Sequence, residues 1–390
     1  MSNYTKLVFQ GGSVKGIAYT GALEVFDKEY GLDKVTAAAG TSAGAITALL
    51  VALGYSMPEL SKLVAEFNFK DLLDDGKGHV STSGPVLKAA GSSGGVLGLF
   101  AKTPAKTKKP VLKYRLMSNW GIYKGDFFRQ WAEERIRERV SAVTGGEQTG
   151  ENLSFGELHD LAQKYPTEFK DLYVVGANLS LGQAVTFSYE NADFRNAIVS
   201  DAVRISMSIP YLFQPHILHY KGDDGERFAD PNEHIWVDGG LLDNYPIGTF
   251  DTRDTDGVHV NNEVLGFRLV RGEMRDFFLD LDDAPETPIA GLLPFSKAIL
   301  TSMSTKQESD HRQRPGDIAR TVYVDHLNVS TLAFDIPEER QEALIGSGRA
   351  AMGKYISGED TYQSEAAGAG ADSDHTHIAL GGAAGAGAGK

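Results

Sequence analysis

The chain contains no cysteine among its 390 residues, which excludes disulfide bonds, thiolate metal sites and a cysteine nucleophile. No apolar run approaches the roughly 18 residues that a membrane-spanning helix requires. The N-terminal residues 1–6 lack the basic and apolar segments of a secretory signal. We therefore expect a cytoplasmic protein that touches membranes only peripherally, and this does not exclude secretion as an effector.

Positive charge is also scarce, since 38 Lys and Arg stand against 52 Asp and Glu and the net charge is −14. This balance argues against broad nucleic-acid binding. Acidic clusters within 251–256 and 280–283 are expected in solvated loops. We therefore expect no metal ion and no cofactor. One segment opposes the trend, because five lysines occur between Lys102 and Lys113.

What is present fits a soluble α/β protein, with 42% hydrophobic and 23% charged residues. Strands are expected at residues 7–9, 35–39, 172–177, 184–187, 235–237, 264–270 and 321–324. Helices are expected at residues 17–29, 43–53, 58–67, from 126 to about 140, 196–207, 292–307 and 337–356. The repeated order of strand, turn and helix predicts a parallel sheet with crossover helices.

Three segments interrupt this pattern. Residues 74–121 are rich in glycine, serine and lysine and are expected to form an irregular insertion. Its apolar residues 96–100 adjoin the lysines, so the insertion could act as a lid or contact a membrane. Residues 276–289 are expected to form a loop. From residue 358 the chain is a Gly/Ala-rich tail that we expect to be disordered.

Glycine is abundant, with 44 residues, and two serines lie in Gly-x-Ser-x-Gly patterns. Ser42, in Gly40-Thr41-Ser42-Ala43-Gly44, follows an expected strand and precedes an apolar helix. A serine at such a strand-to-helix turn is held clear of the backbone for nucleophilic attack. The second match, Gly91-Ser92-Ser93-Gly94-Gly95, has no clear strand before it. The context therefore favours Ser42 over Ser93.

Acyl transfer through a serine also requires an oxyanion pocket and a base. The turn Gly11-Gly12-Ser13-Val14-Lys15-Gly16 follows the first expected strand, so its N–H groups could face a substrate carbonyl. Asp238 ends another expected strand, directly before Gly239 and Gly240. Taken alone, this Asp-Gly pair is only a turn signal.

Several phrases, in this order, resemble the patatin-like phospholipase family. They are the 11–16 turn, Gly40-Thr41-Ser42-Ala43-Gly44, and Asp238-Gly239-Gly240-Leu241-Leu242-Asp243-Asn244-Tyr245-Pro246. Residues 201–215 resemble the helix-to-loop segment of the family, and residues 121–126 and 344–351 resemble stretches of its bacterial members. The resemblance covers residues 5–356, which implies one catalytic domain with a three-layer α/β/α fold and a mostly parallel sheet.

The resemblance implies a Ser-Asp dyad, with Ser42 as the nucleophile, Asp238 as its direct base and the 11–16 loop as the oxyanion hole. It implies a lipid acyl hydrolase of the phospholipase A type, acting on a phospholipid at a membrane surface. The family more often has glycine where this chain has Ser13, whose Cβ restricts positive φ. A carboxylate with a pKa of about 4 is a poor base for serine unless burial raises that pKa.

Three alternatives remain open at the level of sequence. A Ser-Asp-His triad could use Ser42, Asp238 and His259, with His311 and His326 as further candidates. A non-catalytic module could use the 11–16 loop as an anion cradle. Acyl transfer to an acceptor other than water is a third. The sequence specifies neither the headgroup, the ester position, the oligomeric state nor an activating partner.

Overall fold

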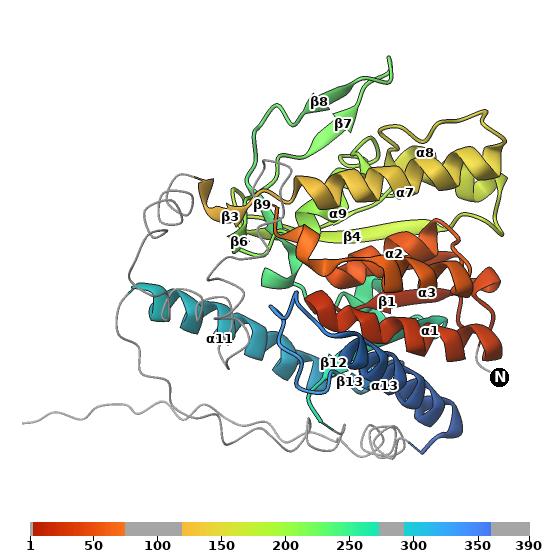
Figure 1. The fold of residues 1–390 in the computed structure, drawn as a ribbon, viewed down its shortest axis with the longest axis vertical. Coiled ribbons are helices and arrows are strands. Elements are labelled where there is room, and N and C mark those ends of the chain that lie inside the picture. The colour runs from red at the N-terminus through yellow and green to blue at the C-terminus, as the bar shows by residue number, and fades with distance from the viewer. Residues whose placement is uncertain (1–2, 75–118, 273–291, 360–390) are drawn as a thin grey trace, which may run out of the picture.

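The structure of the chain is a computed structural model that describes residues 3–74, 119–272 and 292–359 (Figure 1). Several expected features lie outside these ranges. They are Ser93, nearly all of the 74–121 insertion, the 276–289 loop and nearly all of the tail from residue 358.

A seven-stranded sheet lies at the centre of the molecule (Figure 1). Its strands are β1 (Lys6–Phe9), β2 (Ala37–Thr41), β4 (Asp171–Asn178), β5 (Gln183–Phe187), β9 (Trp236–Asp238), β12 (Val264–Val270) and β13 (Thr321–Asp325). The strand order is β13-β12-β1-β2-β4-β5, and β9 also pairs with β4. All pairs from β13 to β4 are parallel, whereas β5 and β9 run antiparallel to β4. The predicted α/β class with a mostly parallel sheet is confirmed.

Helices connect and cover these strands. The α-helices are α1 (Ala18–Glu29), α2 (Ala43–Ala52), α3 (Met57–Glu66), α7 (Asp126–Thr144), α8 (Phe155–Lys164), α9 (Val199–Ser206), α11 (Leu292–Arg312), α12 (Pro315–Ala319) and α13 (Glu338–Ser357). The 3-10 helices are η1 (Ser13–Ile17), η2 (Leu32–Lys34), η3 (Phe69–Leu72), η4 (Gly239–Leu241) and η5 (Ile247–Phe250).

The helices flank both faces of the sheet. Leu7 and Phe9 of β1 point into the large core that α1, α2 and α13 cover, and Val8 points into a smaller cluster on the opposite face. That second face is closed by Tyr245 and by the end of α11, where His311 Nε2 lies 2.8 Å from the hydroxyl of Tyr323. Within the described ranges, no helix is both long and apolar enough to cross a bilayer.

Three small two-stranded sheets were not expected from the sequence. β3 (Gly121–Tyr123) pairs in parallel with β6 (Tyr211–Phe213). β7 (His219–Lys221) with β8 (Arg227–Ala229), and β10 (Thr252–Asp254) with β11 (Gly257–His259), form antiparallel hairpins. Strands this short carry too few residues for a period-2 pattern to stand out.

Element positions agree with the expectations to within a few residues. The strand at 264–270 is confirmed as β12, but the second strand begins at Ala37 rather than Val35 and reaches Thr41. Its residues pair with β1 on one side and with β4 on the other. Pairing on both sides, rather than the strand propensity of an alanine-rich run, sets these bounds.

Candidate active site

Strand register brings Ser42 and Asp238 together, although 196 residues separate them. Thr41, the last residue of β2, pairs with Val175 of β4. Asp238, the last residue of β9, pairs with the next residue of β4, Gly176. Because β5 occupies the other edge of β4, β2 and β9 lie end to end along one edge. The two side chains therefore meet where the two strands end.

The chain turns sharply from β2 into α2 at Ser42. Ser42 has φ 55° and ψ −124°, a backbone conformation that non-glycine residues rarely adopt. The flanking glycines permit this turn. A Cβ on Gly40 would lie 2.3 Å from the carbonyl of Gly44, and a Cβ on Gly44 would lie 2.2 Å from the carbonyl oxygen of Phe9. The expected nucleophile turn is therefore present in its geometry.

The hydroxyl of Ser42 donates a hydrogen bond directly to the carboxylate of Asp238, with Oγ 2.7 Å from Oδ2. Asp238 Oδ1 accepts the N–H of Gly240 at 2.7 Å. Both side chains are buried, with 6% of Ser42 and 5% of Asp238 exposed. Burial raises the pKa of Asp238 to about 7, although the bonds from Ser42 and Gly240 oppose the rise. This carboxylate is a far better base than an exposed one.

The 11–16 loop lies beside this pair. Gly11 is held in place, because its N–H donates to the carbonyl oxygen of Asn244 at 2.9 Å. Among the described residues, no acceptor is bonded to the N–H of Gly12 or Ser13, and both residues line a cavity with Ser42. Ser13 has φ 54°, the positive value at which the Cβ was expected to cause strain.

The remaining residues of the 11–16 loop and the Asp238-Gly239-Gly240 segment pack closely against neighbouring elements of the fold. Val14 is buried, and a Cβ on Gly16 would lie 3.1 Å from the Cβ of Ala43. Gly239 packs so tightly on β4 that a Cβ there would lie 2.3 Å from the carbonyl oxygen of Val175. The structure therefore gathers all the sequence-predicted site residues around Ser42.

Ser42 lies where two cavities of opposite character meet. The first, which we call the apolar pocket, has among its lining residues Val14, Ile17, Ile46, Leu50, Met207 and Phe213. The second, which we call the polar chamber, has among its lining residues Gln10, Gly12, Lys15, Asp238, Asn244 and His326. Ser13, Ser42 and Ile209 line both. One side of the nucleophile can accept a hydrocarbon chain, and the other can accept a polar group.

The polar chamber contains two basic side chains that sequence reasoning did not bring together. No carboxylate of the described residues lies within ion-pair distance of Lys15, and Nδ1 of His326 is buried without a hydrogen-bond partner in the same ranges. Burial lowers the pKa of Lys15, and Glu308 partly offsets this. Burial and the charge of Lys15 lower the pKa of His326 to about 4. Among the described residues, the Lys15 ammonium therefore lines the chamber without a protein acceptor, whereas the His326 ring is neutral at pH 7 and keeps one buried nitrogen without a partner.

None of the three candidate histidines forms a triad with Ser42 and Asp238. His259 lies on the exposed hairpin β10–β11, where its Nε2 is 2.8 Å from Asp254. His311 is buried against Tyr323 and Tyr245. His326 lines the polar chamber, but no hydrogen bond joins it to Asp238. In a triad the histidine would stand between serine and acid, whereas here Ser42 contacts Asp238 directly.

One cluster among the described residues could hold a metal by residue type. Asp201, His216 and His219 place ligand atoms within 4.8 Å of one another. However, Nη2 of Arg227 lies 3.0 Å from both oxygens of Asp201 and 2.9 Å from Nδ1 of His219. The guanidinium group of Arg227 therefore lies where a metal ion would bind, so these residues fit a buried ion-pair network better than a metal site.

Comparison with known proteins agrees with this geometry. Residues 7–251 match the family model described as patatin-like phospholipase, and the chain belongs to that family. The uncharacterized protein YqhO of Bacillus subtilis is 30% identical over 351 residues, which cover 89% of this chain and 96% of that protein. The uncharacterized protein R571 of Acanthamoeba polyphaga mimivirus is 26% identical over 251 residues, covering 64% of this chain and 62% of that protein.

Among solved structures, VipD from Legionella pneumophila has the same fold. Its crystal structure matches with a TM-score of 0.50 and 16% sequence identity, covering 91% of this chain and 67% of that chain. At this identity the likeness concerns the fold alone. Membership of the patatin-like phospholipase family, in contrast, supports a lipid hydrolase activity for this chain.

Proposed function

We propose that the protein is a lipid acyl hydrolase of the phospholipase A type that cleaves fatty-acyl esters of glycerophospholipids. Ser42 is the nucleophile and Asp238 its base, within one catalytic domain of residues 5–356. The observation that carries this proposal is the direct 2.7 Å hydrogen bond from Ser42 Oγ to the buried Asp238, at the junction of the apolar pocket and the polar chamber.

The geometry supports a two-step reaction without histidine. Ionised Asp238 takes the proton of Ser42 as Oγ bonds to the ester carbonyl carbon, and we propose that the N–H groups of Gly12 and Ser13 donate to the oxyanion. When the intermediate collapses, the glycerol oxygen leaves with the proton from Asp238. Water then gives a proton to Asp238 and attacks the acyl carbon, which releases the fatty acid and restores Ser42.

The two cavities support the choice of substrate. The apolar pocket suits the acyl chain, because its lining offers almost no polar group. The polar chamber suits the alcohol part of the ester. The ammonium group of Lys15 lines this chamber and has no hydrogen-bonded acceptor among the described residues, which favours an anionic phosphodiester over a neutral glyceride.

Such a substrate is presented at a membrane surface, so we propose peripheral contact with lipid. The insertion expected to make that contact lies almost wholly outside the described residues. Trp120, at its end, has 57% of its surface exposed, and tryptophan is favoured at the boundary between water and lipid.

The decisive experiment is mass spectrometry of lipids after the full chain is incubated with phospholipid vesicles. Wild type should release fatty acid and lysophospholipid, and Ser42→Ala and Asp238→Asn should each lower release by at least about a thousandfold. His259→Gln is the matched control and should keep wild-type activity, because its side chain pairs only with Asp254.

Other outcomes would point to the alternatives. Activity that survives in Asp238→Asn but is lost in His326→Gln would show that a histidine, and not Asp238, is the base. A wild-type chain that neither releases lipid nor reacts with a fluorophosphonate probe would favour a binding module. Transfer of the acyl group to an added alcohol, in place of water, would favour an acyltransferase.

A further inference from the structure

Ser206, the last residue of α9, joins the nucleophile turn to the central sheet. Its Oγ accepts the backbone N–H of Ser42 at 2.8 Å. The same hydroxyl donates to the carbonyl oxygen of Val175 at 2.6 Å. Ser206 is completely buried and lines neither the apolar pocket nor the polar chamber. Because the hydroxyl donates to Val175, its lone pairs are directed at Ser42.

The turn at Ser42 needs such a partner. The carbonyl of Ser42 accepts the N–H groups of Ala45 and Ile46, and its side chain donates to Asp238. Its own N–H lies between β2 and α2, where neither the strand ladder nor the helix supplies an acceptor. The positive φ of Ser42 persists only if the surroundings hold it. Ser206 supplies the bond that the local backbone does not.

The same segment also holds the base. The carbonyl of Ser208, two residues after Ser206, accepts the backbone N–H of Asp238 at 2.9 Å. Residues 206 and 208 therefore contact the backbones of both members of the dyad. A shift of this segment would move Ser42 and Asp238 relative to each other.

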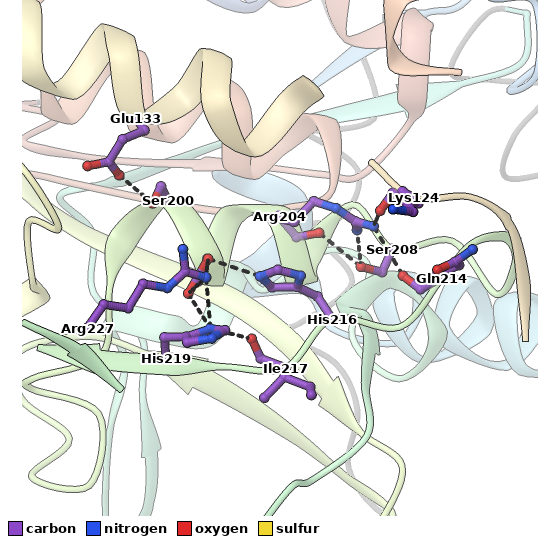
Figure 2. A network of polar contacts seen from close by, with 11 residues as sticks. Lys124, Glu133, Ser200, Arg204, Ser208, Gln214, His216, Ile217, His219 and Arg227 are labelled. Atoms are coloured by element: carbon purple, nitrogen blue, oxygen red, sulfur yellow. Dashed lines mark hydrogen bonds and ion pairs between the residues drawn. The ribbon is translucent and has the colours of Figure 1, made fainter. Parts of the chain in front are cut away.

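The helix that ends at Ser206 is anchored by buried charges (Figure 2). Asp201 lies within hydrogen-bond distance of His216, His219 and Arg227. One turn further, Arg204 donates to Ser208 Oγ and to the carbonyl oxygens of Lys124 and Gln214. These contacts connect α9 to β7, β8 and the 214–216 segment. They restrict the movement of α9 and therefore hold the position of Ser206.

We propose that Ser206 is a positioning residue for the reaction. Its hydroxyl holds the backbone of Ser42 so that Oγ points at Asp238, and it acts only through Ser42. This inference rests on the proposed function, since it takes Ser42 as the nucleophile. It predicts that losing the hydroxyl impairs the chemical step and leaves substrate binding intact.

The test uses the full chain and a fluorophosphonate probe that bears an alkyl chain, with the maximal inactivation rate and the probe's binding constant measured separately. For Ser206→Ala we expect the inactivation rate to fall about tenfold or more, with the binding constant within about twofold of wild type. Ser200→Ala is the matched control. Ser200 is equally buried on α9, but it donates to Glu133 at 2.7 Å (Figure 2). No hydrogen bond joins Ser200 to Ser42 or Asp238.

A second pair of variants separates the hydroxyl from packing. Ser206→Thr keeps a hydroxyl and Ser206→Val does not, while both add nearly the same volume. The threonine variant should react several times faster than the valine variant. If Ser206→Ala does not fold, the comparison of the threonine and valine variants tests the positioning role of the hydroxyl in its place.

The inference is overturned if Ser206→Ala reacts at the wild-type rate, if Ser200→Ala loses as much as Ser206→Ala, or if the threonine and valine variants are equal. A wild-type chain that does not react with the probe would overturn the proposed function, and this inference with it. A reactive wild type with an unimpaired Ser206→Ala would overturn the positioning role alone.

Discussion

At the scale of single residues, the site contains two residues with energetically unfavourable backbone conformations and one buried carboxylate. Ser42 and Ser13 both have positive φ, which costs on the order of 1–3 kcal/mol for a non-glycine residue. Asp238 is a buried carboxylate that forms no ion pair with any described residue, and burial raises its pKa to about 7. The folded chain binds this proton more tightly than the unfolded chain does, so the ionised carboxylate destabilises the fold as pH rises toward 7. The same burial makes Asp238 a useful base.

We therefore predict that kcat/KM rises with pH and levels off above an inflection near 7, rather than near the ordinary carboxyl pKa of 3.8. The rise follows ionisation of Asp238, the form that accepts the serine proton. Initial rates with a soluble short-chain ester between pH 5 and 9 test this. A rate that is flat across this range, or that inflects near 4, would contradict Asp238 as the base.

At the scale of elements, the end of α9 contacts the backbones of Ser42 and Asp238, and a network of buried charges holds this helix in place. Burial alone would raise the pKa of Asp201, but hydrogen bonds from His216 and His219 and the charge of Arg227 outweigh it and hold the pKa well below its ordinary value. The carboxylate therefore stabilises the fold above pH 4, and this contribution is lost as pH falls below that value. The exposed pair of His259 and Asp254 offers a contrast, because each side chain is 55% exposed.

We predict that Asp201→Asn lowers the free energy of unfolding at pH 7 by about 3 kcal/mol, because Arg227 loses its buried counter-charge and His216 and His219 lose the carboxylate that they contact. Asp254→Asn, the same change in the exposed pair, should lower the free energy of unfolding far less. Urea unfolding followed by circular dichroism measures both. Equal losses in the two variants would show that the network contributes no more than a surface pair.

At the scale of the whole molecule, segments beyond the family match complete the sheet. The match ends at residue 251, but β12 pairs with β1, and α13 packs against α1. The two helices approach closely at glycine. A Cβ on Gly348 of α13 would lie 1.9 Å from the carbonyl oxygen of Ala18 in α1. The hydroxyls of Tyr4 and Tyr355 also lie 2.7 Å apart, so the segment before β1 contacts the C-terminal part of α13.

We predict that Gly348→Ala lowers the free energy of unfolding by at least about 2 kcal/mol, because the backbones of α1 and α13 must separate. Gly353→Ala in the same helix has no atom within 4 Å of the added Cβ and should stabilise by up to about 1 kcal/mol. Thermal and urea unfolding check both, and each variant should unfold in one transition if residues 5–356 form one domain. Two separate transitions would argue for two domains.

The elements with strong local patterns were predicted well, and those fixed by distant contacts were not. Residues 264–270 form the expected strand, and the helix beginning at Asp126 has the expected apolar face. α8, whose capping box at Ser154 was a usable signal, was missed, and α11 continues past residue 307 to Arg312. The roles of His326 and Ser206 left no trace in the sequence, because each depends on what the fold places beside it.

Local sequence order was enough to predict the α/β class, the family and Ser42 as the candidate nucleophile, since these depend on a strand, a glycine-flanked serine and an apolar helix in succession. It also offered three histidines that it could not rank. Tertiary structure separates them, because the register of β2 and β9 along β4 sets Ser42 against Asp238, whereas His259 lies on an exposed hairpin and pairs with Asp254. Contacts across 196 residues follow from strand pairing and packing, which no local pattern encodes.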